Sequence, residues 1–303
     1  MKKVKEILEQ SFPLDKMDAI AVGRIDFSSG KFESIEVGVS DHSLNFSGPN
    51  FYYDLASLTK PLTNSLGYFL KPELFDEKML LALSHRAGLP AWGLLSLHTW
   101  KEQVLSYPIS PSPTLYSDFS ALRVLAEFDK KGESLKKTCQ SVWDKEVLNW
   151  LDLKPELPFL QYGSINGEPN FGHVHDPNAY VIGEFCSHAG LFGTIKGVCQ
   201  TLLNYESKTK FISLVTKDLG THKNRFSYGW DRVENFENPL AGKGCGPHSF
   251  GHLGFTGTSI WIDPDKKIGH VILSNATKNY WFDKEALNFI RREVGAAIWS
   301  EGL

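Results

Sequence analysis

The strongest constraint on the fold is that two strand pairs lie at opposite ends of the sequence. Each pair alternates apolar and polar side chains around a short turn of small or polar residues, which is typical of an antiparallel hairpin. The economical architecture is therefore one antiparallel sheet assembled from both ends of the chain. The pairs comprise residues 17–27 and 32–39 around Ser28-Ser29-Gly30, and residues 258–263 and 267–275 around Pro264-Asp265-Lys266.

Helical patterns flank and separate these strand pairs. Amphipathic spacing predicts a first helix through Val4, Ile7, Leu8 and Ser11, and a last helix over residues 282–299. Between about residue 60 and residue 245 the pattern is mainly helical, with few convincing strands. We therefore expect an α/β (α+β) fold, in which an antiparallel sheet is flanked by terminal helices and a helical domain is inserted between its strands. The other expected helices cover residues 57–69, 77–85, 121–131 and 138–151.

Length and composition fit this arrangement. The chain has 303 residues, of which 42% are hydrophobic, so it can bury a sizeable core. The sheet domain is expected to take residues 1–60 and 246–303, and the inserted helical domain residues 61–245. The formal net charge is −3, and charges of both signs are spread without long runs. We therefore expect no nucleic-acid partner and no binding to an anionic membrane surface.

The N-terminus and the cysteines bear on location. The first residues are basic, but Glu6, Glu9 and Gln10 interrupt the apolar run that a signal peptide requires. No stretch approaches roughly 18 apolar residues, so we expect no membrane span. The four cysteines are widely spaced without a Cys-x-x-Cys pair, which favours free thiols and a reducing compartment. The expected location is the cytoplasm, or the periplasm if the chain was trimmed; the sequence does not specify the oligomeric state.

A candidate nucleophile lies in the stretch Asp54-Leu55-Ala56-Ser57-Leu58-Thr59-Lys60-Pro61. Ser57 and Lys60 are three residues apart, which on a helix places their Cβ atoms roughly 5–6 Å from each other on one face. A serine hydroxyl needs an adjacent base, and a lysine serves as that base when its neutral form is favoured. The spacing therefore indicates nucleophilic catalysis, although Ser-x-x-Lys also occurs as an ordinary helix start.

Two further stretches could complete such a site. Tyr116-Ser117-Asp118 precedes a predicted helix; the tyrosine could exchange protons with Ser57, and Asp118 could bind or orient Lys60. The ordinary interpretation is a tyrosine before an aspartate helix cap. His252-Leu253-Gly254-Phe255-Thr256-Gly257-Thr258 leads into a strand, where glycines allow close approach of a ligand and a backbone N–H could join that of Ser57 in an oxyanion hole. The ordinary interpretation there is a glycine-rich bulge.

Taken in order, these three stretches resemble the signature of the serine β-lactamase and penicillin-binding-protein superfamily, which is Ser-x-x-Lys, Ser-Asp-Asn and Lys-Thr-Gly. The resemblance is to the branch with class C β-lactamases, D,D-carboxypeptidases and esterases, where the second motif begins with tyrosine. Three other segments are similar to parts of that family, and the likeness extends over nearly the whole chain. They are Leu83-Ser84-His85-Arg86-Ala87-Gly88-Leu89-Pro90, Val174-His175-Asp176-Pro177-Asn178-Ala179 and Ser187-His188-Ala189-Gly190-Leu191-Phe192.

The resemblance implies a β-lactamase/transpeptidase-like fold with the active site in the cleft between a sheet domain and a helical domain. It implies that Ser57 is acylated, that Lys60 and Tyr116 handle its proton, and that the N–H groups of Ser57 and Phe255 hold the oxyanion. Asp118, His252, Gly254 and Phe255 would contact the substrate. His252 takes the place of the third-motif lysine, and Asp118 stands where many relatives have asparagine. Since histidine titrates near pH 6.5, His252 would hold a substrate carboxylate less firmly than lysine.

The expected activity is therefore serine hydrolysis of a small ester, amide or peptide, of the D,D-carboxypeptidase or esterase type, without a cofactor. The alternative is a catalytically silent protein that keeps the fold and binds or regulates. His173-Val174-His175-Asp176 also has the spacing of metal ligands on a strand. Its place in a family-like loop favours a structural or cleft-lining role, so we expect no metal. His188 is expected to be a buried hydrogen-bonding residue.

Overall fold

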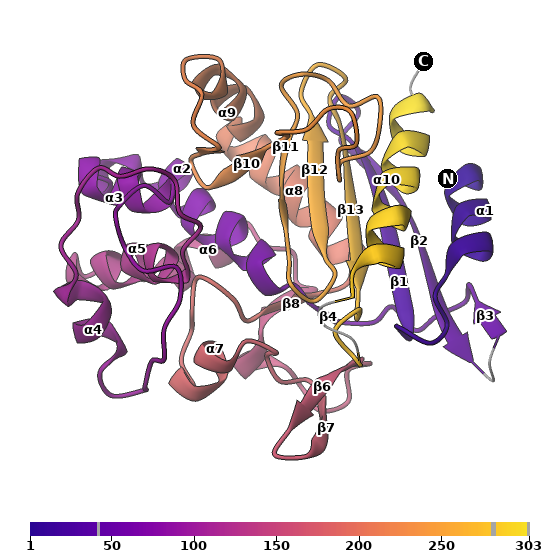
Figure 1. Ribbon diagram of the computed structural model, residues 1–303, viewed down its shortest axis with the longest axis horizontal. Coiled ribbons are helices and arrows are strands. Elements are labelled where there is room, and N and C mark those ends of the chain that lie inside the picture. The colour runs from indigo at the N-terminus through magenta and orange to yellow at the C-terminus, as the bar shows by residue number, and fades with distance from the viewer. Residues whose placement is uncertain (41–42, 280–282, 302–303) are drawn as a thin grey trace.

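A sheet built from both ends of the chain forms the centre of the structure. The computed structural model describes residues 1–40, 43–279 and 283–301. Its large sheet is antiparallel, with the strand order β3-β2-β1-β13-β12-β11-β10-β9. Figure 1 shows this order from β3 to β10. Strand β1 near the N-terminus pairs with β2 on one side and with β13 near the C-terminus on the other, with Ile20 opposite Ser274. The predicted sheet class and both predicted hairpins are thus confirmed.

Helices cover both faces of this sheet because side chains alternate along its strands. In β1, Ile20 and Val22 join the core beneath the terminal helices, while Ala19 and Ala21 belong to the core on the opposite face. The terminal helices α1 and α10 pack against each other on the first face, and α8 packs on the second. Gly23 allows α8 to approach, since a Cβ atom there would lie 2.3 Å from the Cys199 Sγ.

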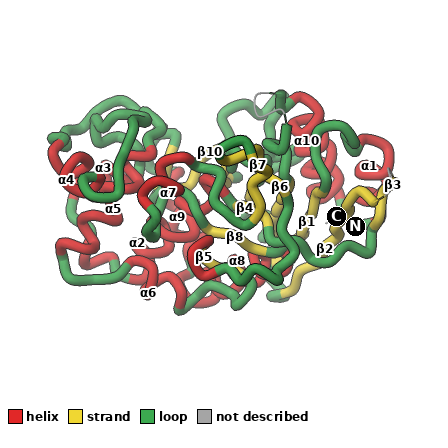
Figure 2. Tube along the Cα trace, turned by 90° about the horizontal axis from the view of Figure 1, so that it is seen from below, coloured by secondary structure: helices red, strands yellow, loops and turns green. Residues whose placement is uncertain are grey.

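The helical region lies to one side of the sheet, as Figures 1 and 2 both show. The strands are β1 (Ala19–Asp26), β2 (Lys31–Ser40), β3 (Ser43–Asn45), β4 (Tyr53–Asp54), β5 (Val147–Asn149), β6 (Gln161–Ile165), β7 (Glu168–Phe171), β8 (Leu191–Gly193), β9 (Phe226–Ser227), β10 (Trp230–Arg232), β11 (Phe250–Leu253), β12 (Ser259–Asp263) and β13 (Ile268–Ser274). The helices are α1 (Lys2–Ser11), α2 (Leu66–Leu70), α3 (Glu77–Leu83), α4 (Trp100–Ser106), α5 (Asp118–Lys130), α6 (Leu135–Gln140), α7 (Pro177–Ile182), α8 (Ile195–Thr209), α9 (Phe211–Leu219) and α10 (Glu285–Ser300).

The expected helix over residues 138–151 is wrong. Helix α6 ends at Gln140, and residues 147–149 form strand β5 beside β8. The Asp144 carboxylate accepts a hydrogen bond from the N–H of Glu146 at 2.9 Å, a local turn that competes with a helix. Pairing with β8 then makes this segment a strand. The local sequence pattern could not predict this pairing. Short strands β5 to β10 are also more frequent in the middle of the chain than the sequence suggested.

The expected helix over residues 57–69 exists, but in three pieces. A 3-10 turn over Ala56–Leu58 leads into a wide π turn over Pro61–Ser65 and then into α2. Pro61 has no N–H to donate, which accounts for a break in the regular ladder at this point. The residue expected to start the last helix, Phe282, lies outside the described residues.

The division into a sheet domain and an inserted helical domain remains a prediction. Strands β9 and β10 lie before residue 246 and nevertheless extend the large sheet beyond β11. In the described part of the chain, no helix combines the length and the apolar character needed to cross a membrane.

Candidate active site

The backbone before Ser57 adopts a conformation that is unusual for its sequence. Ala56 has a φ of 46°, in the left-handed region that residues with a Cβ atom rarely occupy. The buried Asp54 carboxylate holds this turn, because Oδ1 accepts the Ala56 N–H at 2.8 Å and Oδ2 accepts the His175 N–H at 2.7 Å. Burial raises the pKa of Asp54 to about 7, although these two N–H donors oppose the shift. The turn presents Ser57 at the wall of a cavity.

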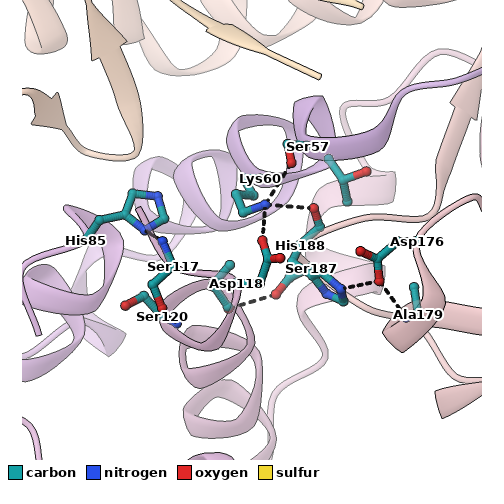
Figure 3. A network of polar contacts seen from close by, with 12 residues as sticks. Ser57, Lys60, His85, Ser117, Asp118, Ser120, Asp176, Ala179, Ser187 and His188 are labelled. Atoms are coloured by element: carbon teal, nitrogen blue, oxygen red, sulfur yellow. Dashed lines mark hydrogen bonds and ion pairs between the residues drawn. The ribbon is translucent and has the colours of Figure 1, made fainter. Parts of the chain in front are cut away.

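The Lys60 amine lies next to the Ser57 hydroxyl (Figure 3). The Lys60 side chain is almost completely buried. Its Nζ donates to the Ser57 Oγ at 2.9 Å and to the backbone carbonyl of His188 at 3.1 Å. It also forms an ion pair with the Asp118 Oδ1 at 2.7 Å. The structure therefore brings together the first motif and the aspartate of the second.

The charge of Lys60 follows from these neighbours. Burial by itself lowers the pKa of the Lys60 amine. The adjacent Asp118 carboxylate and the Tyr116 side chain outweigh burial and raise the pKa above its ordinary value. Lys60 is accordingly an ammonium ion in the free protein, and not the neutral base that the spacing alone suggested.

Tyr116 completes this group from the loop before α5. Its ring centroid lies 4.9 Å from the Lys60 Nζ, and the His85 ring packs against it at 4.7 Å. Burial raises the pKa of the Tyr116 phenol, while Lys60 and Ser57 partly oppose the shift, so the phenol keeps its proton at neutral pH. The Nδ1 atom of neutral His85 accepts the Ser117 N–H at 3.1 Å, which fixes the backbone next to Tyr116. Ser117, rather than Asp118, caps α5, since its Oγ accepts the Ser120 N–H at 2.9 Å.

A second ion pair lies beneath the first. The Nε2 atom of buried His188 contacts the Asp176 Oδ1 at 2.9 Å (Figure 3). Burial opposes the charge on His188, but the Asp176 carboxylate raises the pKa of the imidazole to about 10. Although burial raises the pKa of Asp176, His188 holds it well below its usual range. Because the His188 carbonyl receives a hydrogen bond from Lys60, this second pair also positions the first.

Two buried hydroxyl groups join the third motif to the turn that precedes Ser57. Thr256 donates to the Asp54 carbonyl at 2.6 Å, and Thr258 donates to the Leu55 carbonyl at 3.0 Å. Burial, reinforced by the charge of Lys60, lowers the pKa of His252 to about 3. His252 is thus neutral at physiological pH, and it cannot supply the positive charge of the third-motif lysine.

Gly254 is required by the protein's own packing. A Cβ atom at this position would lie 1.9 Å from the Thr258 Oγ1 and 2.8 Å from the Leu55 carbonyl oxygen. We expect Gly254→Ala to lower the free energy of unfolding by about 1–3 kcal/mol, as overpacking of a tight site does. Urea denaturation measures this loss. Gly38→Ala is the control, because its Cβ would have ordinary contacts of 3.4 Å or more; equal midpoints for the two variants would contradict the prediction.

A cavity of about 540 Å³ opens above Ser57. Six of the seven predicted site residues line it, and the seventh, Lys60, lies behind Ser57 and contacts it. Charged side chains that the sequence analysis did not single out also line the cavity. Arg225 pairs with Asp231 through two contacts of 2.8 and 2.7 Å, whereas Lys284 and Arg291 form no ion pair with any carboxylate of the described residues. The predicted residues that line the cavity are Ser57, Tyr116, Asp118, His252, Gly254 and Phe255.

The unpaired cations come from the segment before α10 and from α10 itself. The Lys284 Nζ donates to the Phe255 carbonyl at 2.8 Å, and Arg291 donates to the Thr258 carbonyl at 2.8 Å. Burial lowers the pKa of Lys284 to about 8 and that of Arg291 to about 10, so both remain largely cationic at pH 7. The sequence analysis missed Lys284 and Arg291 because their seven-residue spacing indicates only that they share one face of a helix. It does not indicate that this face lies against the cavity.

The possible metal ligands do not share a site. The His173 ring packs near Trp150, with centroids 6.0 Å apart, whereas the His175 ring lies 5.6 Å from that of Phe255 at the cavity. Within the described ranges, no three side chains of the types that bind metals are grouped as a metal site would need. His175 and Asp176 therefore belong to the cavity wall, the role that the sequence analysis favoured.

Comparison with known proteins places this site in context. Residues 82–294 match the model of the Beta-lactamase family, a range that includes Tyr116 and His252 and begins after Ser57 and Lys60. A relative from Escherichia coli O157:H7 named "Putative D-alanyl-D-alanine carboxypeptidase" is 34% identical over 127 residues, which is 38% of this chain. The match spans 29% of that relative's length.

Solved structures show the same fold at low sequence identity. A class C beta-lactamase mutant is 15% identical with a TM-score of 0.67, and the match covers 99% of this chain and 96% of that one. A hydrolase with promiscuous acyltransferase activity is 16% identical with a TM-score of 0.66, and the match covers 98% of both chains. The β-lactamase-like fold expected from the sequence is thereby confirmed.

Proposed function

The chain belongs to the Beta-lactamase family of serine hydrolases, and from this premise we propose that it hydrolyses a small ester, amide or peptide through an acyl-enzyme on Ser57. One observation carries the proposal. The Ser57 hydroxyl lies at a cavity wall, 2.9 Å from a buried lysine amine, with a tyrosine phenol beside that amine. This arrangement provides a nucleophile and two groups that can transfer its proton.

The roles follow from position. Ser57 attacks the substrate carbonyl, and Lys60 and Tyr116 handle the proton that is released. The N–H groups of Ser57 and Phe255 are assigned to the oxyanion, since both residues line the cavity. Asp118 orients Lys60, and His252, Gly254 and Phe255 form the wall along which the substrate lies.

The charges of the cavity favour a substrate that carries a carboxylate. The pairs Lys60–Asp118, His188–Asp176 and Arg225–Asp231 each combine one positive and one negative charge. Lys284 and Arg291 remain as two cations without a carboxylate partner among the described residues. Because His252 is neutral, these two side chains are the ones that can attract a substrate carboxylate, as a carboxypeptidase of the D,D type requires.

A silent binding protein is the second candidate, and one observation favours it. Lys60 is an ammonium ion and Tyr116 a neutral phenol, so neither is ready to accept a proton in the free protein. Binding without turnover would need only the cavity and its charges.

Mass spectrometry of the intact protein distinguishes the two candidates. The protein is incubated separately with a fluorescent penicillin, with p-nitrophenyl butyrate and with a peptide ending in D-alanyl-D-alanine. We expect an acyl adduct from at least one donor, mapped to the peptide that contains Ser57, and no adduct in Ser57→Ala. Neither adduct nor turnover with any of the three donors would favour the binding protein.

A further inference from the structure

The resting site lacks an obvious acceptor for the proton of Ser57. We propose that the carboxylate of Asp118 is this acceptor and that it works through Lys60: Asp118 takes a proton from Lys60, and Lys60 takes the proton of Ser57. The inference rests on the proposed function, because it concerns the acylation of Ser57. It gives Asp118 a catalytic role beyond orienting Lys60.

The contacts of Lys60 carry the argument. An ammonium group has three N–H bonds, and the Lys60 Nζ has three oxygen partners, which are Ser57 Oγ at 2.9 Å, Asp118 Oδ1 at 2.7 Å and the His188 carbonyl at 3.1 Å. With all three bonds engaged, Nζ has no lone pair for the Ser57 proton. Of the three oxygens, only that of Asp118 belongs to a group that readily accepts a proton, since the others are an alcohol and an amide carbonyl.

Burial makes this internal transfer feasible. Lys60 is 3% exposed and Asp118 is 19% exposed in their side chains, and low polarity penalises separated charges more than a neutral pair. Conversion of the ion pair to amine and carboxylic acid moves one proton along a 2.7 Å contact and leaves the net charge of the site unchanged. The titratable or charged side chains that face Lys60 are Asp118, Tyr116, Asp176, His85 and His252.

The step balances in protons and electrons. After Lys60 gives one proton to Asp118, rotation about its Cε–Nζ bond turns the new lone pair toward the Ser57 hydroxyl. The Ser57 oxygen then bonds to the substrate carbonyl carbon, the carbonyl π pair moves to the oxyanion, and the Ser57 proton moves to Nζ. When the tetrahedral intermediate collapses, the leaving group takes a proton from Lys60, Lys60 recovers one from Asp118, and the carboxylate is restored.

The test is the pH dependence of Ser57 acylation in the full chain. The variant Asp118→Asn keeps the shape of the side chain and removes the acceptor. We expect its acylation by p-nitrophenyl butyrate at pH 7 to be about 10²–10³ times slower than that of the wild type. Below the pKa that Lys60 has in this variant, the rate should then rise about tenfold per pH unit, because Lys60 must release a proton to the solvent before it can act. The wild-type rate should be nearly flat between pH 7 and pH 9.

Asp231→Asn is the charge-matched comparison, because Asp231 lines the same cavity and has no contact with Lys60. The acylation rate of this variant should keep the flat pH profile of the wild type. An Asp118→Asn rate within threefold of wild type at pH 7, or a slow rate that does not change with pH, would overturn the proposal. No Ser57 adduct in the wild type would instead overturn the proposed function.

Nitrogen NMR of the Lys60 side chain gives a readout that is independent of turnover. In Asp118→Asn the ammonium signal should disappear at a lower pH than in the wild type. Burial lowers the pKa of Lys60, and the variant lacks the carboxylate that opposes this effect. An unchanged titration would show that Asp118 does not control the proton of Lys60, and would also overturn the inference.

Discussion

Replacement of Lys60 by arginine is expected to abolish acylation of Ser57, with a loss of about 10⁴-fold in rate, the upper end of what a positioned proton-transfer group contributes. Arginine keeps the positive charge beside Asp118, but it cannot be deprotonated in a protein and so cannot take the Ser57 proton. The measurement is the rate of adduct formation by intact mass spectrometry.

Lys60→Met separates proton transfer from stability. Methionine fills a similar volume but leaves the Asp118 carboxylate without its ion-pair partner, so this variant should lose both acylation and folding stability. Lys60→Arg and Lys60→Met should acylate Ser57 equally slowly. Thermal unfolding should distinguish them, because only Lys60→Met leaves Asp118 without its ion-pair partner. Near-normal labelling of the arginine variant would show that the charge of residue 60, and not its proton, is what Ser57 requires.

The largest effect on stability is expected at the second ion pair. Asp176→Asn should lower the free energy of unfolding by about 3–5 kcal/mol near pH 6, because it leaves the His188 imidazolium buried without its carboxylate. An asparagine side chain can still accept the Ala179 N–H that Asp176 accepts at 2.8 Å, so the cap of α7 is retained and the change reports the lost charge.

The pH dependence of this loss has a definite sign. The pKa of His188 is raised from 6.5 to about 10, so the stability it contributes is fully present below pH 6.5 and is lost as the pH rises toward 10. The pKa of Asp176 is lowered, so its contribution is lost only in acid. The difference between wild type and Asp176→Asn should therefore shrink between pH 6.5 and pH 10. Urea denaturation of both proteins at pH 6 and at pH 9.5 measures this difference in the free energy of unfolding.

The exposed pair between His248 and Asp265 provides a matched control. Its atoms lie 3.2 Å apart and its side chains are 48% and 55% exposed, so Asp265→Asn should cost at most about 1 kcal/mol. If Asp176→Asn and Asp265→Asn lowered the free energy of unfolding equally, burial would not account for the strength of the His188–Asp176 pair.

Local patterns in the sequence predicted the parts of the site that depend on local geometry. Ser57 and Lys60 are neighbours on one turn, and their contact follows from the three-residue spacing. The two hairpins follow from alternation and turn residues. Tyr116 was named from its residue type as a possible proton partner of Ser57. Its convergence with Ser57 and His252 was expected from the order of the three motifs and the family that this order resembles, since that convergence depends on the whole topology.

Features that depend on distant neighbours were missed. Asp118 was expected to bind or orient Lys60, but the positive charge that this carboxylate, 58 residues away along the chain, maintains on Lys60 was not expected. The ion pair of His188 with Asp176 and the approach of Lys284 and Arg291 to the cavity are set by tertiary packing. The helix expected over residues 138–151 was wrong for the same reason, because β8 lies far along the chain from β5.

The hydroxyls of Thr256 and Thr258 have a consequence for how the site can open. They fasten the end of the third motif to the carbonyls of Asp54 and Leu55, so these two walls cannot separate without breaking two buried hydrogen bonds. Trp92 also lines the cavity and is 49% exposed, so its indole can shift without breaking either of these bonds. The turn that carries Ser57 and the end of the third motif therefore move together, as one unit tied by these two bonds.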